Sequence, residues 1–161
     1  MPVVTQLARL SDDQVAACAR DRDALELLCE GSFLPPADYT NMNWFPNLFD
    51  KAAVRAGIDF EHVEAIRQST AGNRDLHPGY SGLYTTYGPL TYLDSSEAGN
   101  VARRLSEIKL SILFEQQVVD IAVAGSDLID PRKNMVMWFK KLRRFYREAA
   151  RRKLAVALWL D

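Results

Sequence analysis

The residue types that most often bind metals or act as nucleophiles are scarce in this chain of 161 residues. It contains two histidines, His62 and His77, and two cysteines, Cys18 and Cys29. Neither histidine has a cysteine or a second histidine at the spacing of a zinc site, which needs three or four such ligands. We therefore expect no metal and no cofactor. His62 lies beside two glutamates in a helical pattern, which is typical of a solvated helix face.

The sequence also lacks the common catalytic and nucleotide-binding motifs. There is no G-x-S-x-G element and no Walker motif, and the three glycines between residues 79 and 88 do not match the dinucleotide pattern G-x-G-x-x-G. Neighbouring carboxylates occur at Asp12 and Asp13 and at Asp127 and Asp130. They lie at the starts of expected helices, where a carboxylate stabilises the helix dipole without a catalytic role. These patterns favour a protein that is not an enzyme.

One polar segment supports an alternative. Residues 73–87 combine Arg74, Asp75 and His77 with glycines and tyrosines. Loops that mix polar types in this way often carry binding and catalytic sites. The alternative is therefore an enzyme or small-molecule binder whose site lies on this loop, although a plain connecting loop explains the same residues.

A row of basic residues follows the last helical pattern of the chain. Lys140, Arg144, Arg147 and Arg151 recur at steps of four, three and four, which places them on one face of a helix. Four more basic residues widen this row: Lys141, Arg143, Arg152 and Lys153. Such a row is typical of the solvated face of an amphipathic helix. It is also compatible with contact to a protein partner, to the acidic half of the same fold, or to a phosphate backbone.

The charges are distributed unevenly along the chain. Residues 1–100 contain 14 acidic and 7 basic side chains, a net charge of -7, and residues 101–161 contain 7 acidic and 13 basic side chains, a net charge of +6. The whole chain has a net charge of -1 and an isoelectric point of about 6.1. It therefore has no overall attraction to a polyanion. A protein partner is favoured, and a nucleic acid is disfavoured.

Four aromatic side chains in expected loops are further candidates for partner binding: Trp44, Tyr80, Tyr84 and Tyr87. Tryptophan and tyrosine are enriched at the residues that dominate binding energy in protein interfaces. Anchoring of the loops to the core explains the same side chains, so both interpretations remain open.

Hydrophobic patterns predict the elements that position these residues. Residues 3–10 are β-branched and apolar at their start, which predicts a first strand, and Ser11 and Gln14 have the spacing of a capping box at a helix start. From Met135 to Ala149, apolar residues recur at steps of four and three behind Pro131, which predicts a long helix. Apolar residues also recur at helical spacing from residue 101 to residue 112, which predicts a buried stripe, and the period continues loosely to residue 123.

Two short apolar runs, residues 90–93 and 154–160, predict further strands, and the second is typical of a strand buried on both faces. A chain of this length fits one domain. The predicted fold is therefore α+β: a single helix-rich domain, residues 1–161, with a small sheet that includes N-terminal and C-terminal strands.

Location is predicted from three features. The longest apolar run, residues 154–160, is far shorter than the roughly 20 residues of a membrane-spanning helix. The first 20 residues lack the basic and apolar regions of a secretion signal. The two cysteines have apolar neighbours and are predicted to be buried free thiols. We expect a cytoplasmic protein without a membrane partner.

Two segments in the second half of the chain carry a resemblance. In the first, Tyr-Gly-Pro at residues 87–89 precedes the apolar residues 90–93, an acidic cap and the helical pattern 101–108. In the second, the helical residues 139–150 precede the apolar residues 154–160. Their order and spacing, over residues 85–161, resemble the YfbM-like family of bacterial proteins of unknown function. The resemblance implies a compact α+β domain and brings no established activity or catalytic residues.

The function predicted from these features is that of a non-enzymatic protein-binding module, such as a bacterial immunity protein that neutralises a toxin by direct binding. A small domain without catalytic polar clusters, with aromatic loops and segregated charge, favours it, because such charge steers association with a complementary partner. The alternatives are the 73–87 loop site and a nucleic-acid-associated protein that uses the basic helix at residues 140–153.

Overall fold

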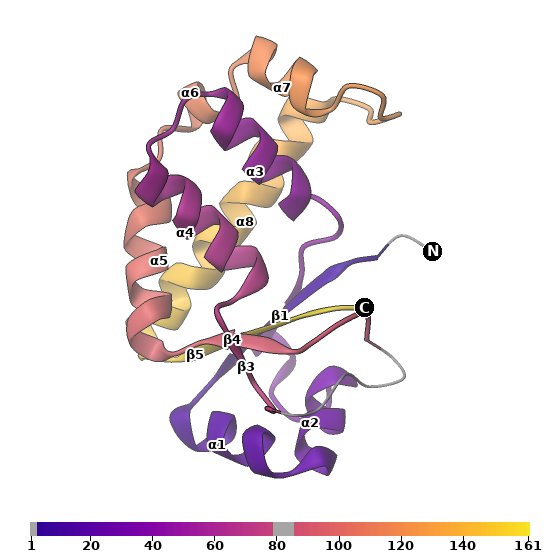
Figure 1. Cartoon of the computed structure of the whole chain (residues 1–161), viewed down its shortest axis with the longest axis vertical. Helices are drawn as coiled ribbons and strands as arrows, with labels where there is room; N and C mark the ends of the chain where they lie inside the picture. Colours follow the sequence, from indigo (N-terminus) through magenta and orange to yellow (C-terminus); the bar gives the residue numbers. More distant parts are fainter. Residues whose placement is uncertain (1–2, 79–85) are drawn as a thin grey trace.

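The structure, a computed structural model, describes residues 3–78 and 86–161. A five-stranded antiparallel sheet lies at its centre, in the order β2-β1-β5-β4-β3, with helices on both faces (Figure 1). The strands are β1 Thr5–Leu10, β2 Tyr39–Asn41, β3 Arg74–Asp75, β4 Thr91–Leu93 and β5 Ala155–Leu160. The described residues therefore form an α+β fold, as the sequence predicts.

The strands from the two ends of the chain pair in the middle of the sheet. β1 and β5 are antiparallel over six consecutive residue pairs, from Thr5 opposite Leu160 to Leu10 opposite Ala155. This pairing confirms the predicted N-terminal and C-terminal strands. β2 and β3 were not expected from the sequence, because their few residues, YTN and RD, form no apolar run of the kind that predicts β4.

β5 is buried on both faces, as its continuous apolar run predicts. Val156 and Leu158 belong to the larger of two hydrophobic cores, and Ala157 and Trp159 belong to the smaller one. The smaller core lies under α1 (Asp12–Arg20) and α2 (Arg22–Cys29). The predicted capping box of Ser11 and Gln14 starts α1.

The other face of the sheet carries the larger helical layer. Its helices are α3 Pro46–Arg55, α4 Phe60–Ala71, α5 Ser95–Glu107, α6 Leu110–Leu113, α7 Gln116–Ala122 and α8 Pro131–Arg152. The predicted apolar stripe of α8 is confirmed, since Met135, Phe139 and Leu142 are fully buried. The ring of Phe139 packs edge to face on those of Phe49 and Phe114, with centroids 5.2 and 5.6 Å away.

The helical period predicted over residues 101–123 is interrupted, and this part of the prediction is wrong. α5 ends at Glu107, Ile108 adopts an extended conformation, and two short helices follow. Helix ends leave carbonyls without partners. Here Arg143 of α8 donates from Nε to the carbonyl of Leu105 (2.7 Å) and from Nη2 to that of Ile108. A side chain distant in sequence therefore stabilises the break.

A buried ionic cluster joins the sheet to the C-terminal end of α8. Asp38, at the end of the 3-10 helix η1 (Pro36–Asp38), accepts from Nε of Arg9 at 3.0 Å and from Nη1 of Arg152 at 2.5 Å. The side chains of Arg9 and Asp38 are only 9% and 8% exposed. The guanidinium of Arg9 also lies 4.6 Å from the ring centre of Phe145. One carboxylate is therefore shared by two cations.

We predict that Asp38→Asn strongly destabilises the protein. The substitution leaves a buried guanidinium without a counter-charge, and breaking such a pair costs about 3 kcal/mol of unfolding free energy. Urea denaturation followed by circular dichroism measures the change. The matched control is Asp127→Asn at an exposed position, which should alter stability by less than about 0.5 kcal/mol. Equal stability of the two variants would contradict the assigned role of Asp38.

Candidate functional site

The outer face of α8 carries a row of exposed side chains at steps of four and three: Lys133, Met137, Lys140, Arg144 and Arg147. Within the part of the chain that the structure describes, the side chains of the four cations form no hydrogen bond or ion pair. The predicted basic row therefore exists as an exposed surface, and the same step extends it back to Lys133.

Arg151, the last member of the predicted row, differs from the others. Its guanidinium donates to both carboxylate oxygens of Glu148, at 2.9 and 2.6 Å. This hydrogen bond raises the pKa of Arg151 and lowers that of Glu148. The positive charge of Arg151 is consequently compensated on the same helix, which leaves Lys140, Arg144 and Arg147 as the uncompensated part of the prediction.

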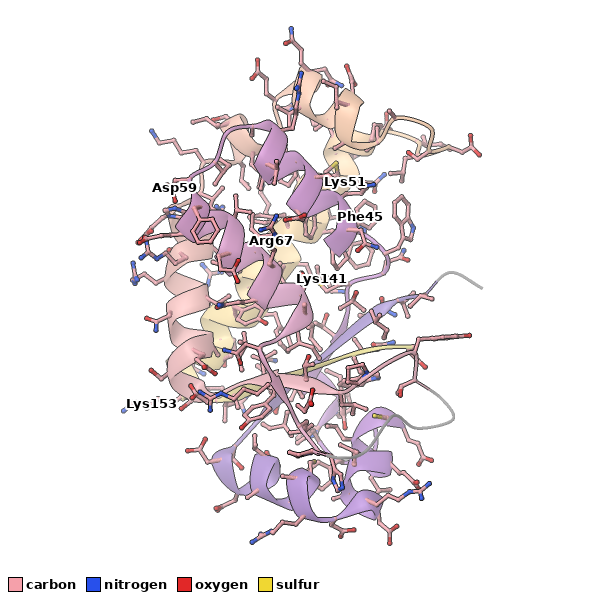
Figure 2. The ribbon with its side chains drawn as sticks, viewed as in Figure 1. Phe45, Lys51, Asp59, Arg67, Lys141 and Lys153 are labelled. Carbon is pink, nitrogen blue, oxygen red and sulfur yellow. The ribbon has the colours of Figure 1, made fainter. Side chains whose placement is uncertain are left out.

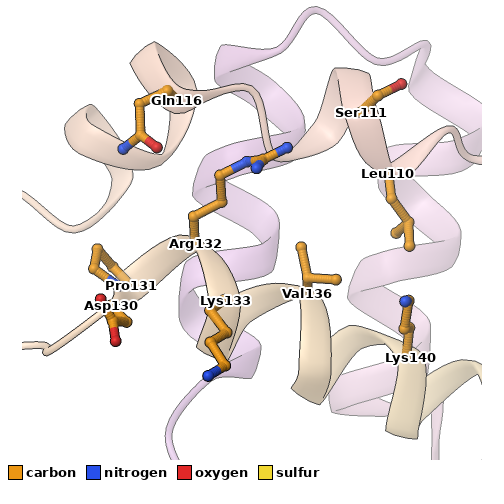
Figure 3. Close-up of a pocket in the computed structure, with 9 residues that line it drawn as sticks. All are labelled: Leu110, Ser111, Gln116, Asp130, Pro131, Arg132, Lys133, Val136 and Lys140. Atoms are coloured by element: carbon orange, nitrogen blue, oxygen red, sulfur yellow. The ribbon is translucent and has the colours of Figure 1, made fainter.

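Three adjoining hollows lie along this face of α8. The first, of about 770 Å³, lies between α8 and α6, where Val136 and Lys140 are opposite Leu110 (Figure 3). The second, of about 650 Å³, shares these three residues and continues to Arg144 and Arg147. The third, of about 480 Å³, continues from Arg147 along α5. We refer to the three together as the basic groove.

Among the described residues that line the basic groove, Asp130 is the only acidic one. The basic lining residues are Arg103, Arg132, Lys133, Lys140, Arg143, Arg144 and Arg147. In the second hollow the apolar lining residues are Leu110, Val136 and Met137, and the Met137 side chain is exposed. The groove thus combines positive walls with an apolar floor.

Some of the basic lining residues have structural roles. Arg143 holds the end of α5 as described above, and Arg132 donates from Nε to the carbonyl of Phe114 at 2.7 Å, between α6 and α7. Arg103 is paired with Glu107 at 2.9 Å. Lys141, which widens the predicted row, donates to the carbonyl of Asn41 at 2.6 Å and lies over the Trp138 ring. These contacts build the groove walls and leave four cations for a ligand.

The aromatic candidates occupy a different place. Trp44 and Tyr87 both line a groove of about 540 Å³ at the end of the sheet, beside Leu160. The Tyr87 side chain is 59% exposed, whereas Trp44 is half-buried and stacks on Phe45 with centroids 5.1 Å apart. Tyr80 and Tyr84 lie outside the described residues. Trp44 is thus both a core anchor and part of a concave surface.

The candidates of the 73–87 loop have other partners. Arg74 pairs with Glu97 at 2.8 Å and with Asp94 at 3.3 Å. Asp75 is exposed in β3, and Nδ1 of half-buried His77 lies 2.9 Å from the carbonyl oxygen of Cys18 in α1. None of these three loop residues lines the grooves described above. The geometry therefore connects them to neighbouring elements rather than to a shared hollow.

The cysteines are not activated as nucleophiles. Both thiols are free, as the sequence predicts. Cys18 is buried, which confirms its predicted burial, whereas Cys29 is only half-buried. Burial raises the thiol pKa of Cys18 to about 11 and that of Cys29 to about 12. Since the thiolate is the reactive form, neither side chain is poised for attack at neutral pH. No group of three or more metal-ligating side chains occurs among the described residues.

The surroundings of His62 differ from those predicted from the sequence. His62 is not on a solvated helix face: its side chain is only 16% exposed and lies between two carboxylates. Nδ1 is 2.6 Å from Asp59 Oδ1, and Nε2 is 2.8 Å from Glu107 Oε2 on α5. The hydrogen bond to Asp59, together with that to Glu107, raises the pKa of His62 and lowers those of both carboxyl groups. The cluster joins the start of α4 to the end of α5.

The comparisons with known proteins place the fold. An antiparallel sheet between two helical layers, in which the strands nearest the two ends of the chain pair with each other, defines an α+β class of protein. Among solved structures, the chain is similar to YfbM from Escherichia coli, a protein of unknown function, with a TM-score of 0.61 and 12% identity, over 98% of this chain and 99% of that chain. The resemblance seen in residues 85–161 thus extends, as a shared fold, over nearly the whole chain.

The other comparisons add no family. No family model matches the sequence, and no curated protein matches it. In the described part of the chain, no helix combines the length and apolar character required to cross a bilayer. A fold shared with a protein of unknown function assigns no activity to this chain.

We predict that His62 stabilises the fold most in mildly acidic solution. Its raised pKa means that its contribution is complete below the ordinary pKa of 6.5 and is lost as the pH rises through the folded-state value. The carboxyl groups, with lowered pKa values, contribute above their ordinary values of 3.8 and 4.5 and lose that contribution as the pH falls. Near pH 6 the pH is below the ordinary pKa of histidine and above those of the two carboxyl groups, so all three side chains contribute to stability.

Urea denaturation of the wild type and of His62→Gln at pH 6 and pH 9 measures this effect. The difference in unfolding free energy between the two proteins should be larger at pH 6. In the Glu107→Gln background the difference should depend less on pH, because one of the two carboxylates is gone. A His62→Gln effect of the same size at both pH values would contradict the proposed charge state.

Proposed function

We propose that this chain is a protein-binding module whose interface is the basic groove and whose partner presents acidic side chains. The observation that carries the proposal is the set of four cations, Lys133, Lys140, Arg144 and Arg147, whose side chains have no acidic partner within the described residues. Like charges three or four residues apart on a helix destabilise it by about 0.2–0.5 kcal/mol per pair. The arrangement therefore does not serve helix stability, and an acidic ligand would relieve the repulsion.

The lining favours protein over nucleic acid. Proteins that bind single strands stack bases on aromatic side chains, and no aromatic residue is among the described residues of the basic groove. The net charge of -1 gives no general attraction to a duplex. The apolar floor of Leu110, Val136 and Met137 suits a partner that presents apolar side chains together with carboxylates.

The specific role that we propose is sequestration of one partner, as an immunity protein neutralises a bacterial toxin by direct binding. Segregated charge supports it, because complementary charge accelerates and orients association. The proposed location is the cytoplasm, which is consistent with two free cysteines, since thiols stay reduced there. A captured partner that stops growth when produced alone, and does not when produced with this chain, would support this role.

Affinity capture with a charge-reversed control tests the interface. We predict that tagged wild-type protein retains an acidic partner at low salt, and that Lys140→Glu/Arg144→Glu/Arg147→Glu retains at least about tenfold less, because the charge pairs become repulsive. The matched control is Arg20→Glu/Lys51→Glu/Arg55→Glu, which changes the net charge equally at exposed positions outside the groove (Figure 2 labels Lys51 on α3).

Quantitative mass spectrometry of the three eluates gives the result. The control variant should retain the same partner as the wild type, and the retained amount should fall as salt is increased. Equal capture by all three proteins, or no stoichiometric partner for any of them, would count against the proposal. Circular dichroism shows whether each variant is folded.

A further inference from the structure

The spacing of the exposed row on α8 limits the shape of a ligand that can contact all of it. Lys133, Met137, Lys140, Arg144 and Arg147 follow steps of four, three, four and three. At 1.5 Å per residue, the row is about 21 Å long, and neighbouring members are about 5 Å apart along the helix axis. Steps of four and three are also those of the contact positions in paired helices.

From this spacing, and resting on the proposed function, we infer that the occupant of the basic groove is an acidic amphipathic α-helix that lies along α8. A helix with side chains at steps of four and three, carboxylates opposite the cations and an apolar residue opposite Met137, repeats its contacts about every 5 Å and therefore matches each member of the row. An extended segment presents side chains on one face about every 6.8 Å and falls out of register after two contacts.

The chemistry of the groove varies along its length and sets the pattern of the partner. At the end near Lys133, Val136 and Leu110 lie on opposite walls of the groove among polar residues, and Asp130 is the one acidic residue of the described lining (Figure 3). Toward Arg144 and Arg147 the lining becomes mainly cationic. The partner helix should therefore place apolar residues at the end that meets α6 and most of its carboxylates at the other end.

The far end of the groove permits close approach of a helix. Gly99, Ala102 and Ala150 line the third hollow together with Arg147. A Cβ atom added to Gly99 would have no other atom within 4 Å, so the surface of α5 is open there. Small residues allow helix backbones to approach closely. A partner helix seated here would bring its last carboxylates within reach of the Arg147 guanidinium.

Binding of designed peptides to the full chain tests the inference. The probe is a fluorescent peptide of about 18 residues, long enough for helix formation, with glutamates at steps of four and three along one face and leucines beside them at one end. The comparison peptide has the same composition with glutamates at every second position. We expect the helical pattern to bind at least about tenfold more tightly, measured by fluorescence anisotropy at low salt.

Three further measurements decide between occupants. The helical signal of the probe in circular dichroism should increase on binding, and the affinity should be lost in Lys140→Glu/Arg144→Glu/Arg147→Glu but kept in Arg20→Glu/Lys51→Glu/Arg55→Glu. Equal or tighter binding of the alternating peptide would overturn the helix inference while leaving the capture test of the proposed function unaffected. Tighter binding of a labelled DNA duplex in the same assay would overturn it in favour of a phosphate ligand.

Discussion

The pairing of β1 with β5 is the contact on which the rest of the fold depends. β5 has a strand on each side and a hydrophobic core on each face, so its side chains from Ala155 to Trp159 are all buried. The two strands come from opposite ends of the chain, and their pairing closes a very long loop. The entropy of closing a loop grows slowly with its length, so the twelve-residue ladder and two cores can offset it.

This central pair also fixes the surface proposed to bind a partner. α8 leads directly into β5 through Lys153, which adopts a left-handed conformation at the sheet end of the helix (Figure 2). The Asp38 cluster ties the same end of α8 to β1, and the buried stripe ties its length to the larger core. With one face of α8 held in this way, the face that carries Lys140 and Arg144 must point outward.

Local patterns predicted much of this arrangement. The capping box at Ser11, the apolar stripe of α8 and the apolar run of β5 are each read within a few residues, and each is confirmed. The contacts that depend on distant residues could not be predicted. His62 has Asp59 three residues away but Glu107 45 residues away, and Arg143 stabilises the break after α5 from another helix. Sequence periodicity identified the basic row, but not Leu110 or Arg103, which border the groove from α6 and α5.

The uneven charge along the sequence is only partly compensated when the chain folds. Part of the opposite charge in the two halves is neutralised within the fold: Arg104 pairs with Glu61, and Arg152 pairs with Asp38. These pairs fall at contacts between α4 and α5 and between α8 and η1. The cations of the outer face of α8 are different, because the elements packed around them supply few carboxylates. Four of the cations that remain without an acidic partner among the described residues lie together in the basic groove, where a ligand from outside the fold can compensate them.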